Sequence, residues 1–338
     1  MNSFLWARAP IALVPVMLFL IALVQGDSFK LVRLRTVLIL LAVGAVAAGV
    51  SYAINAYAYE HFAGGFDAYS RFISPWIEEC AKAVIMLYLI RTRRVGLLVD
   101  AAIAGFAIGT GFALVENLYY LASRPDTSLG VQVIRGFGTA IMHGGTTTLL
   151  AILSITLFER RPNGRWAVLL PGILAAVVLH SGFNWLLVKP ALAALAMLLV
   201  LPFAIYLVFR HSERTLRNWL DADLDSKARL LELVNSGTFL DSPVGRVLNS
   251  LRDRFQGEDL ADMLCLLRLH GELAMRAKGV LLLRESGMAD LPLDDETRDK
   301  LAELAQLERS IGTTGMLALR PLMMATGKDI WQLRLLSR

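Results

Sequence analysis

Residues 98–121 read LVDAAIAGFAIGTGFALVENLYYL and are predominantly apolar. A bilayer core of about 30 Å is crossed by about 20 helical residues, so this segment is long enough to span a membrane. The whole chain of 338 residues is 56% hydrophobic and 19% charged, whereas soluble domains have about 45–50% apolar and about 25% charged residues. The segment and the composition together indicate an integral membrane protein.

Six further segments on either side of this one share its character. The seven apolar segments cover residues 10–24, 36–59, 74–90, 98–121, 131–158, 166–187 and 190–209. We therefore expect an all-α fold, a polytopic bundle of about seven membrane-spanning helices. The first segment resembles the core of a signal peptide, but no small-residue cleavage site follows it, so we interpret it as a retained span.

The pattern changes after residue 210. Apolar residues then recur at helical spacing with charges between them, as in residues 259–278 and 294–310. We expect a transmembrane catalytic domain at 1–210 and a soluble helical domain at 211–338, whose partner is unknown. The first region carries 16 Lys and Arg against 9 Asp and Glu, and the second carries 18 against 20. Because the positive charge belongs to the apolar region, the composition argues against nucleic-acid binding.

The short loops alternate in their content of Lys and Arg. The loops at 25–35, 91–97 and 159–165 and the start of the tail hold three each, and the intervening loops hold one each. Cytoplasmic loops of membrane proteins are enriched in these residues. We therefore expect the N-terminus outside and the C-terminal domain in the cytoplasm.

Four of the expected spans contain polar residues that are costly in a bilayer, about 2.5–3.5 kcal/mol for an ionisable side chain at its centre. These residues are Glu78, Glu79, Lys82, Glu116, Asn117, His143, His180 and Asn184. Counted inward at 1.5 Å per residue, the acids and histidines lie ~8–18 Å below the outer surface. We expect them to converge on one water-accessible pocket in the outer half of the membrane. Asp100, at a cytoplasmic end, is expected to be solvated instead.

The local spacing refines this expectation. Glu78 and Glu79 point about 100° apart on a helix, so one should act on the substrate while the other orients or forms an ion pair. Lys82 follows them at i+4 and i+3 and can pair with either carboxylate. His180 and Asn184 are one helical turn apart, which places an amide beside the imidazole.

Small residues flank the same positions. Gly105 and Gly109 form a small-xxx-small face, and two glycines follow His143 directly. Such residues let helices approach closely, so we expect tight packing beside the site. Cys80 has no neighbouring histidine to activate it and is expected to be a packing residue.

Carboxylates with imidazoles, without an evident Ser or Cys nucleophile, suit the activation of water. In one route a glutamate is the general base, and a histidine with Asn184 stabilises the oxyanion. In the other, His143, His180 and Glu116 hold a divalent metal ion such as zinc, and a second glutamate is the base. No cofactor is required by the first route. The expected catalytic set is Glu78, Glu79, Glu116, His143, His180 and Asn184, with Lys82 and Asn117 in support.

Four motifs in chain order resemble the PrsW family of intramembrane proteases, in the group that includes CAAX-prenyl endopeptidases and bacteriocin-processing membrane proteins. They are Glu78-Glu79-x-x-Lys82, Phe112-x-x-x-Glu116-Asn117, His143 with its glycines, and His180-x-x-x-Asn184. The resemblance covers residues ~70–190. It implies an endopeptidase of the bacterial cytoplasmic membrane that cleaves membrane-anchored proteins, such as an anti-sigma factor. It leaves the glutamate and metal routes open, and we favour glutamate-activated water.

Two other classes of protein are alternatives. A proton- or cation-coupled transporter would use the same buried acids and histidines as a relay. Transporters of that kind usually have inverted repeats and a site near the membrane midplane, whereas this sequence shows no repeat and its polar residues are off-centre. A signalling receptor would leave the buried acids unexplained.

Overall fold

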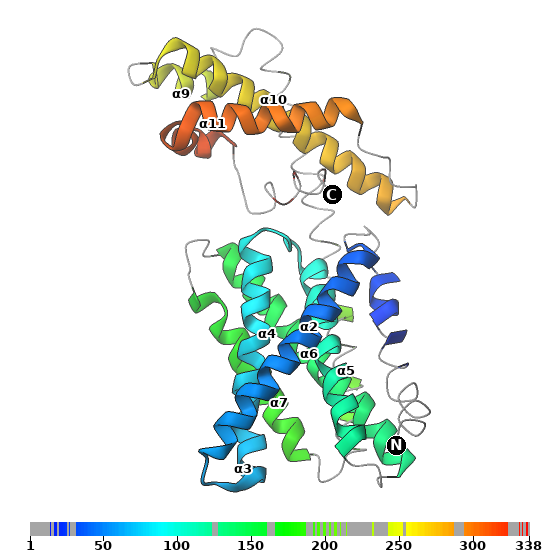
Figure 1. Ribbon diagram of the computed structural model, residues 1–338. Coiled ribbons are helices and arrows are strands. Elements are labelled where there is room, and N and C mark those ends of the chain that lie inside the picture. Colours follow the sequence, from blue (N-terminus) through cyan, green and yellow to red (C-terminus); the bar gives the residue numbers. More distant parts are fainter. Residues whose placement is uncertain are drawn as a thin grey trace. The chain divides into compact units, whose positions relative to one another are not determined.

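We describe the protein from a computed structural model. It describes residues 32–123, 128–160, 166–186, 243–252, 255–286 and 294–323 continuously, with scattered residues before 32, between 187 and 242, and after 323. Every regular element within these residues is a helix (Figure 1), which confirms the all-α fold. The chain divides into two compact units, Met1–Glu213 and Arg214–Arg338. Each unit is described by itself below.

The continuously described part of the first unit contains six α-helices. They are α2 (Leu34–Glu60), α3 (Gly65–Phe72), α4 (Ser74–Arg91), α5 (Leu98–Ser123), α6 (Leu129–Arg160) and α7 (Leu170–Leu186), with a 3-10 turn at Trp166–Val168 before α7. Five of the predicted spans therefore coincide with helices. Residues 10–24 and 190–209, the other two predicted spans, are described only in part.

The helices differ in how well they suit a bilayer. Three are long and apolar enough to cross one, namely α2, α5 and the Gly130–Phe158 part of α6, and Leu170–Trp185 of α7 is a shorter apolar helix. The fifth, α4, has 18 residues and carries the two glutamates and the lysine of the first motif. The chain is thus an integral membrane protein, and α4 brings charged side chains into its helix bundle.

α5 lies at the centre of the bundle. It packs between α2 and α6, while α4 packs against α2 and α7 (Figure 1). A Cβ atom added to Gly109 would overlap the backbone carbonyl of His143, and one added to Gly111 would overlap that of Leu41. At Gly105 it would lie 2.6 Å from the carbonyl oxygen of Thr147. The expected tight packing at Gly105 and Gly109 is confirmed, and it brings the backbone of α6 against α5 at His143.

Residues near the first turn stabilise the starts of α5 and α4. The Asp100 carboxylate, 2% exposed, accepts hydrogen bonds from the backbone N–H of Gly96 at 3.0 Å and of Leu97 at 2.8 Å. The expectation that Asp100 is solvated was therefore wrong, because its carboxylate instead holds the loop that enters α5. Pro75 lies in the first turn of α4, where its missing N–H removes no helical hydrogen bond.

The second unit contains α9 (Pro243–Ser250), α10 (Gly257–Glu285) and α11 (Asp295–Met323). A capping box between Gln256 and Asp259 starts α10, and a non-helical Gly312 with φ of 67° interrupts α11. The apolar faces of these helices form a core that includes Leu248, Met263, Leu266, Leu273, Ala277, Leu304 and Leu319. The helices predicted within 259–278 and 294–310 are confirmed, and both are longer than predicted.

Candidate active site

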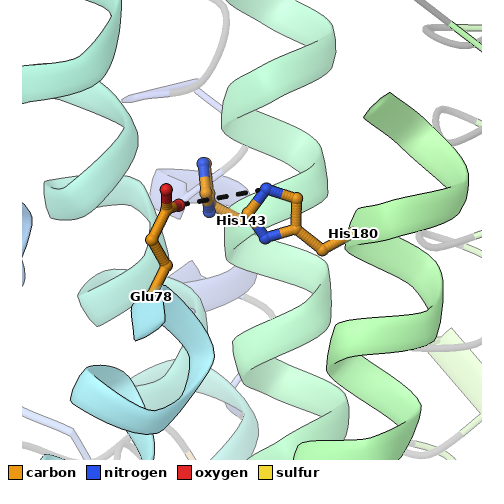
Figure 2. A group of neighbouring side chains, drawn as sticks. All are labelled: Glu78, His143 and His180. Carbon is orange, nitrogen blue, oxygen red and sulfur yellow. Dashed lines mark ion pairs between the residues drawn. The ribbon is translucent and has the colours of Figure 1, made fainter. Parts of the chain in front are cut away.

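Six of the predicted side chains meet inside the first unit, and they come from four helices. Glu78, Glu79 and Lys82 lie on α4, Glu116 on α5, His143 on α6 and His180 on α7. We call these six residues the polar cluster. Figure 2 shows three of its members, Glu78, His143 and His180, projecting toward one another from their helices.

Lys82 lies at the centre of the polar cluster. Its Nζ atom donates a hydrogen bond to Glu79 Oε1 at 2.6 Å and lies 2.9 Å from His143 Nδ1. It also lies 4.7 Å from the centroid of the Phe112 ring. Lys82, Glu79 and His143 are all 0% exposed. A fully buried ammonium group therefore joins α4 to α6.

His180 connects the two glutamates of α4. Its Nδ1 atom lies 2.9 Å from Glu79 Oε1, and its Nε2 atom lies 3.9 Å from Glu78 Oε2, the pair dashed in Figure 2. The imidazoles of His143 and His180 meet edge to face with ring centroids 4.8 Å apart. The two histidines, from α6 and α7, are therefore neighbours.

The second ring nitrogen of His143 contacts the glutamate of α5. His143 Nε2 lies 2.5 Å from Glu116 Oε2, and the Glu116 side chain is 36% exposed. The polar cluster thus forms one continuous series, Glu78–His180–Glu79–Lys82–His143–Glu116. Its middle is buried, whereas its two ends, Glu78 at 14% and Glu116, reach the surface of the unit.

These contacts fix the tautomers of both histidines. An ionised carboxylate only accepts hydrogen bonds, so His180 donates from Nδ1 to Glu79 and His143 donates from Nε2 to Glu116. A neutral imidazole then keeps a lone pair on its other nitrogen. His180 Nε2 faces Glu78, and His143 Nδ1 accepts from Lys82.

Glu78, His143 and His180 each offer one ligand atom, and these atoms lie within 4.8 Å of one another. Two further observations fit a metal ion at this place. Each histidine contacts a carboxylate through one ring nitrogen, His180 that of Glu79 and His143 that of Glu116. This arrangement orients metal-ligating imidazoles. The Oε2 atoms of Glu78 and Glu79 are buried and have no hydrogen-bond partner among the described residues.

The ligand set differs in one member from the expected His143, His180 and Glu116. Glu78 takes the third place in the group that the structure brings together, and Glu116 instead stands behind His143. The trio of one carboxylate and two imidazoles is a common ligand set of catalytic zinc sites.

The position of Glu78 depends on residues that the sequence analysis did not single out. Ser74 Oγ donates to Glu78 Oε1 at 2.6 Å, and Asn55 Nδ2 lies 3.4 Å from the same oxygen. Tyr69 OH in turn donates to Asn55 Oδ1 at 2.8 Å. Asn55 was detectable, because it is an amide within the apolar segment 36–59, as Asn117 is within 98–121.

The two predicted asparagines bind backbone rather than the polar cluster. Asn184 Nδ2 donates to the Ser70 carbonyl at 2.8 Å, which ties α7 to α3, and Asn117 Nδ2 donates to the Gly136 carbonyl at 2.8 Å, which ties α5 to α6. Cys80 is exposed, so the expectation that it is a packing residue was wrong.

A cation near the exposed end of the polar cluster was also missed. The guanidinium carbon of Arg135, on α6, lies 3.6 Å from the centroid of the Tyr120 ring. Arg135 is near enough to Glu116 to interact with it electrostatically.

The chain matches the family model described as PrsW family intramembrane metalloprotease over residues 33–209. The matched region is more than half of the chain and contains the whole polar cluster. The chain belongs to the PrsW family. This confirms the family indicated by the four motifs, and the second unit lies outside the matched residues.

One curated PrsW relative is similar to the chain. "Protease PrsW" of Clostridioides difficile (strain 630) is 28% identical over 147 residues, which are 40% of this chain and 60% of the relative. The chain therefore spans about 60% of the length of the curated relative that it matches. No solved structure matches the chain.

Proposed function

We propose that this protein is an intramembrane endopeptidase that uses the polar cluster to hydrolyse peptide bonds of membrane-associated proteins. The observation that carries the proposal is the contact of three carboxylates, two imidazoles and an ammonium from four helices in a PrsW-family chain. Such groups are costly inside a bilayer, so their assembly at one place favours a chemical role. Family membership also favours a protease over a transporter.

Glu78 is best placed to take the proton from an attacking water. Ser74 holds its Oε1 atom, and its buried Oε2 atom has no hydrogen-bond partner among the described residues and is free to accept a proton. As the water oxygen adds to the scissile carbonyl carbon, the proton passes to Glu78 Oε2, and the same carboxyl then returns it to the leaving amine. Glu79 supports this step by orienting His180.

The same residues fit a divalent metal ion such as zinc. Glu78, His143 and His180 would hold the ion, and Glu79 and Glu116 would orient the two imidazoles. When bound, such an ion supplies Lewis-acid polarisation of the substrate carbonyl and of water. Elemental analysis of the purified protein and the response of cleavage to chelators distinguish this route from the glutamate route.

We propose that the polar cluster faces the outer half of the bacterial cytoplasmic membrane, with the N-terminus outside and the second unit in the cytoplasm. The alternation of Lys and Arg in the loops supports this orientation. A site near the outer surface suits a membrane-anchored substrate cut on its extracytoplasmic side, such as an anti-sigma factor.

The test uses the full chain reconstituted in liposomes with candidate single-span substrates. The candidates are membrane proteins that accumulate uncut in a deletion strain. We expect Glu78→Gln and His180→Ala to stop cleavage while both variants remain folded in the membrane. Glu60→Gln, at the exposed end of α2, is the matched control and should cleave normally. Wild-type cleavage by both site variants would overturn the proposal.

A further inference from the structure

Both ring nitrogens of His143 are engaged. Lys82 Nζ lies 2.9 Å from Nδ1, and Glu116 Oε2 lies 2.5 Å from Nε2. An imidazole has only these two nitrogens. A metal ion can therefore bind His143 only where Lys82 or Glu116 gives way.

The position of the proton on the His143 ring decides whether Lys82 or Glu116 gives way. The Nε2 hydrogen points to Glu116, so the lone pair that a cation needs lies on Nδ1, where Lys82 donates. An ammonium group and a divalent ion at this distance repel each other, and burial strengthens the repulsion because little water screens it. Lys82 is 0% exposed, so it cannot keep its place beside a bound ion.

We propose that Lys82 is the resident cation of the polar cluster and competes with a divalent metal ion for Nδ1 of His143. The inference rests on the proposed ligand set of Glu78, His143 and His180, and it concerns the affinity for a metal ion rather than the cleavage reaction. The ammonium offsets the negative charge of the carboxylates when no ion is bound, so the cluster is stable in both states. The affinity for the ion then depends on how readily Lys82 moves.

The neighbouring carboxylate provides a place for the displaced ammonium. Lys82 is three residues from Glu79 on the same helix and bonds its Oε1 atom at 2.6 Å. The Oε2 atom of Glu79 is buried without a hydrogen-bond partner among the described residues. Lys82 can therefore leave His143 and keep its ion pair with Glu79.

The experiment measures Zn²⁺ binding to the full chain in detergent, by titration against a competing chelator after removal of bound metal. Lys82→Met removes the charge and keeps most of the length of the side chain. We expect it to bind Zn²⁺ about 5- to 150-fold more tightly than the wild type, the usual range for coupling between two bound groups. Lys82→Arg keeps the charge and should bind no more tightly than the wild type. Lys300→Met, in the second unit, is the matched control and should leave Zn²⁺ affinity unchanged.

Thermal unfolding gives a second readout that does not depend on cleavage. Without metal, Lys82→Met should have a lower Tm than the wild type, because the carboxylates lose their cation, and Zn²⁺ should restore it. If Lys82→Met does not fold, Lys82→Gln, a shorter neutral side chain, is used in both measurements with the same expectation. Equal or weaker Zn²⁺ binding by the neutral variant overturns the inference, as does an absence of Zn²⁺ binding in both proteins. Cleavage by the wild type, measured separately, shows whether the proposed function stands in that case.

Discussion

Glu79 Oε1 lies 2.9 Å from His180 Nδ1, so a fully buried carboxylate of α4 sets the tautomer of an imidazole of α7. The other ring nitrogen of His180 is left with its lone pair toward Glu78. Glu79 therefore contacts one ring nitrogen of His180 and Glu78 lies toward the other, as their angular separation on the helix allows. That one of the two acts on the substrate stays a prediction.

Replacing Glu79 tests the orienting role. Glu79→Gln should lower kcat by about 10–100-fold. Loss of a carboxylate that orients a functional imidazole usually reduces activity by about this factor. Glu79→Asp keeps the charge and should retain more activity than Glu79→Gln. Cleavage rates in liposomes provide the measurement. Equal activity of Glu79→Gln and the wild type would contradict an orienting role.

Ser74 is expected to hold the general base in place. Ser74→Ala removes the 2.6 Å hydrogen bond to Glu78 and should lower kcat by about 10- to 150-fold, since a hydrogen bond to a charged group contributes about 1.5–3 kcal/mol. Ser74→Thr keeps the hydroxyl and should restore activity. Ser70→Ala is the control, because that hydroxyl donates to the Asp67 carbonyl. Unchanged kcat in Ser74→Ala would show that Glu78 needs no such support.

The approach of α5 to α6 depends on Gly109. Gly109→Ala would place a methyl group on the His143 carbonyl, and overpacking of this kind costs about 1–3 kcal/mol. We expect a lower Tm and lower activity, since His143 moves with its backbone. Gly182→Ala, where a Cβ atom meets nothing within 4 Å, should be at least as stable as the wild type. Similar Tm values for the two variants would count against this packing argument.

Asn184 distinguishes a structural role from a catalytic one. Its hydrogen bond to Ser70 predicts that Asn184→Ala lowers the free energy of unfolding by about 1–3 kcal/mol and changes kcat little. An oxyanion donor would instead lower kcat by about 10²–10³ when removed. Measuring kcat and chemical unfolding on the same preparation separates the two outcomes.

The second unit should lose stability in acid through Glu272. Partial burial raises the pKa of Glu272, but hydrogen bonds from Lys300 and Arg268 outweigh it and bring the pKa below its ordinary 4.5. A carboxylate with a lowered pKa stabilises the folded state above its unfolded pKa, and this stabilisation disappears as the pH falls through the folded pKa. Hydrogen-exchange protection of α10 should therefore be lower in Glu272→Gln than in the wild type at pH 7. The two proteins should converge as the pH falls through the lowered pKa of Glu272, and a difference that persists in stronger acid would contradict this assignment.

Hydropathy predicted the helices well because span length is set by a one-dimensional property of the sequence. The segment 36–59 corresponds to α2 at Leu34–Glu60, and 98–121 corresponds to α5 at Leu98–Ser123. Counting along a helix of known rise likewise places the acids and histidines at similar levels along their spans. The membership of the polar cluster was therefore predictable.

Which members of the polar cluster contact one another was not predictable from the sequence. α5 is buried on nearly all sides between residues 99 and 113, so its apolar pattern has no period that specifies which face meets which neighbour. The rotation of each helix decides that Glu78 rather than Glu116 joins the histidines in the candidate metal group. The support of Glu78 by Asn55 depends in the same way on how α2 and α4 cross.

Cys80 follows the fully buried Glu79 directly, yet its thiol is exposed, because consecutive residues point about 100° apart on a helix. The sequence contains one other cysteine, Cys265. Replacing Cys265 with serine would leave a single thiol on the back of the helix that carries both glutamates. A nitroxide or fluorophore attached there would follow rotation of α4 as substrate or Zn²⁺ is added, while every reactive side chain stays unmodified.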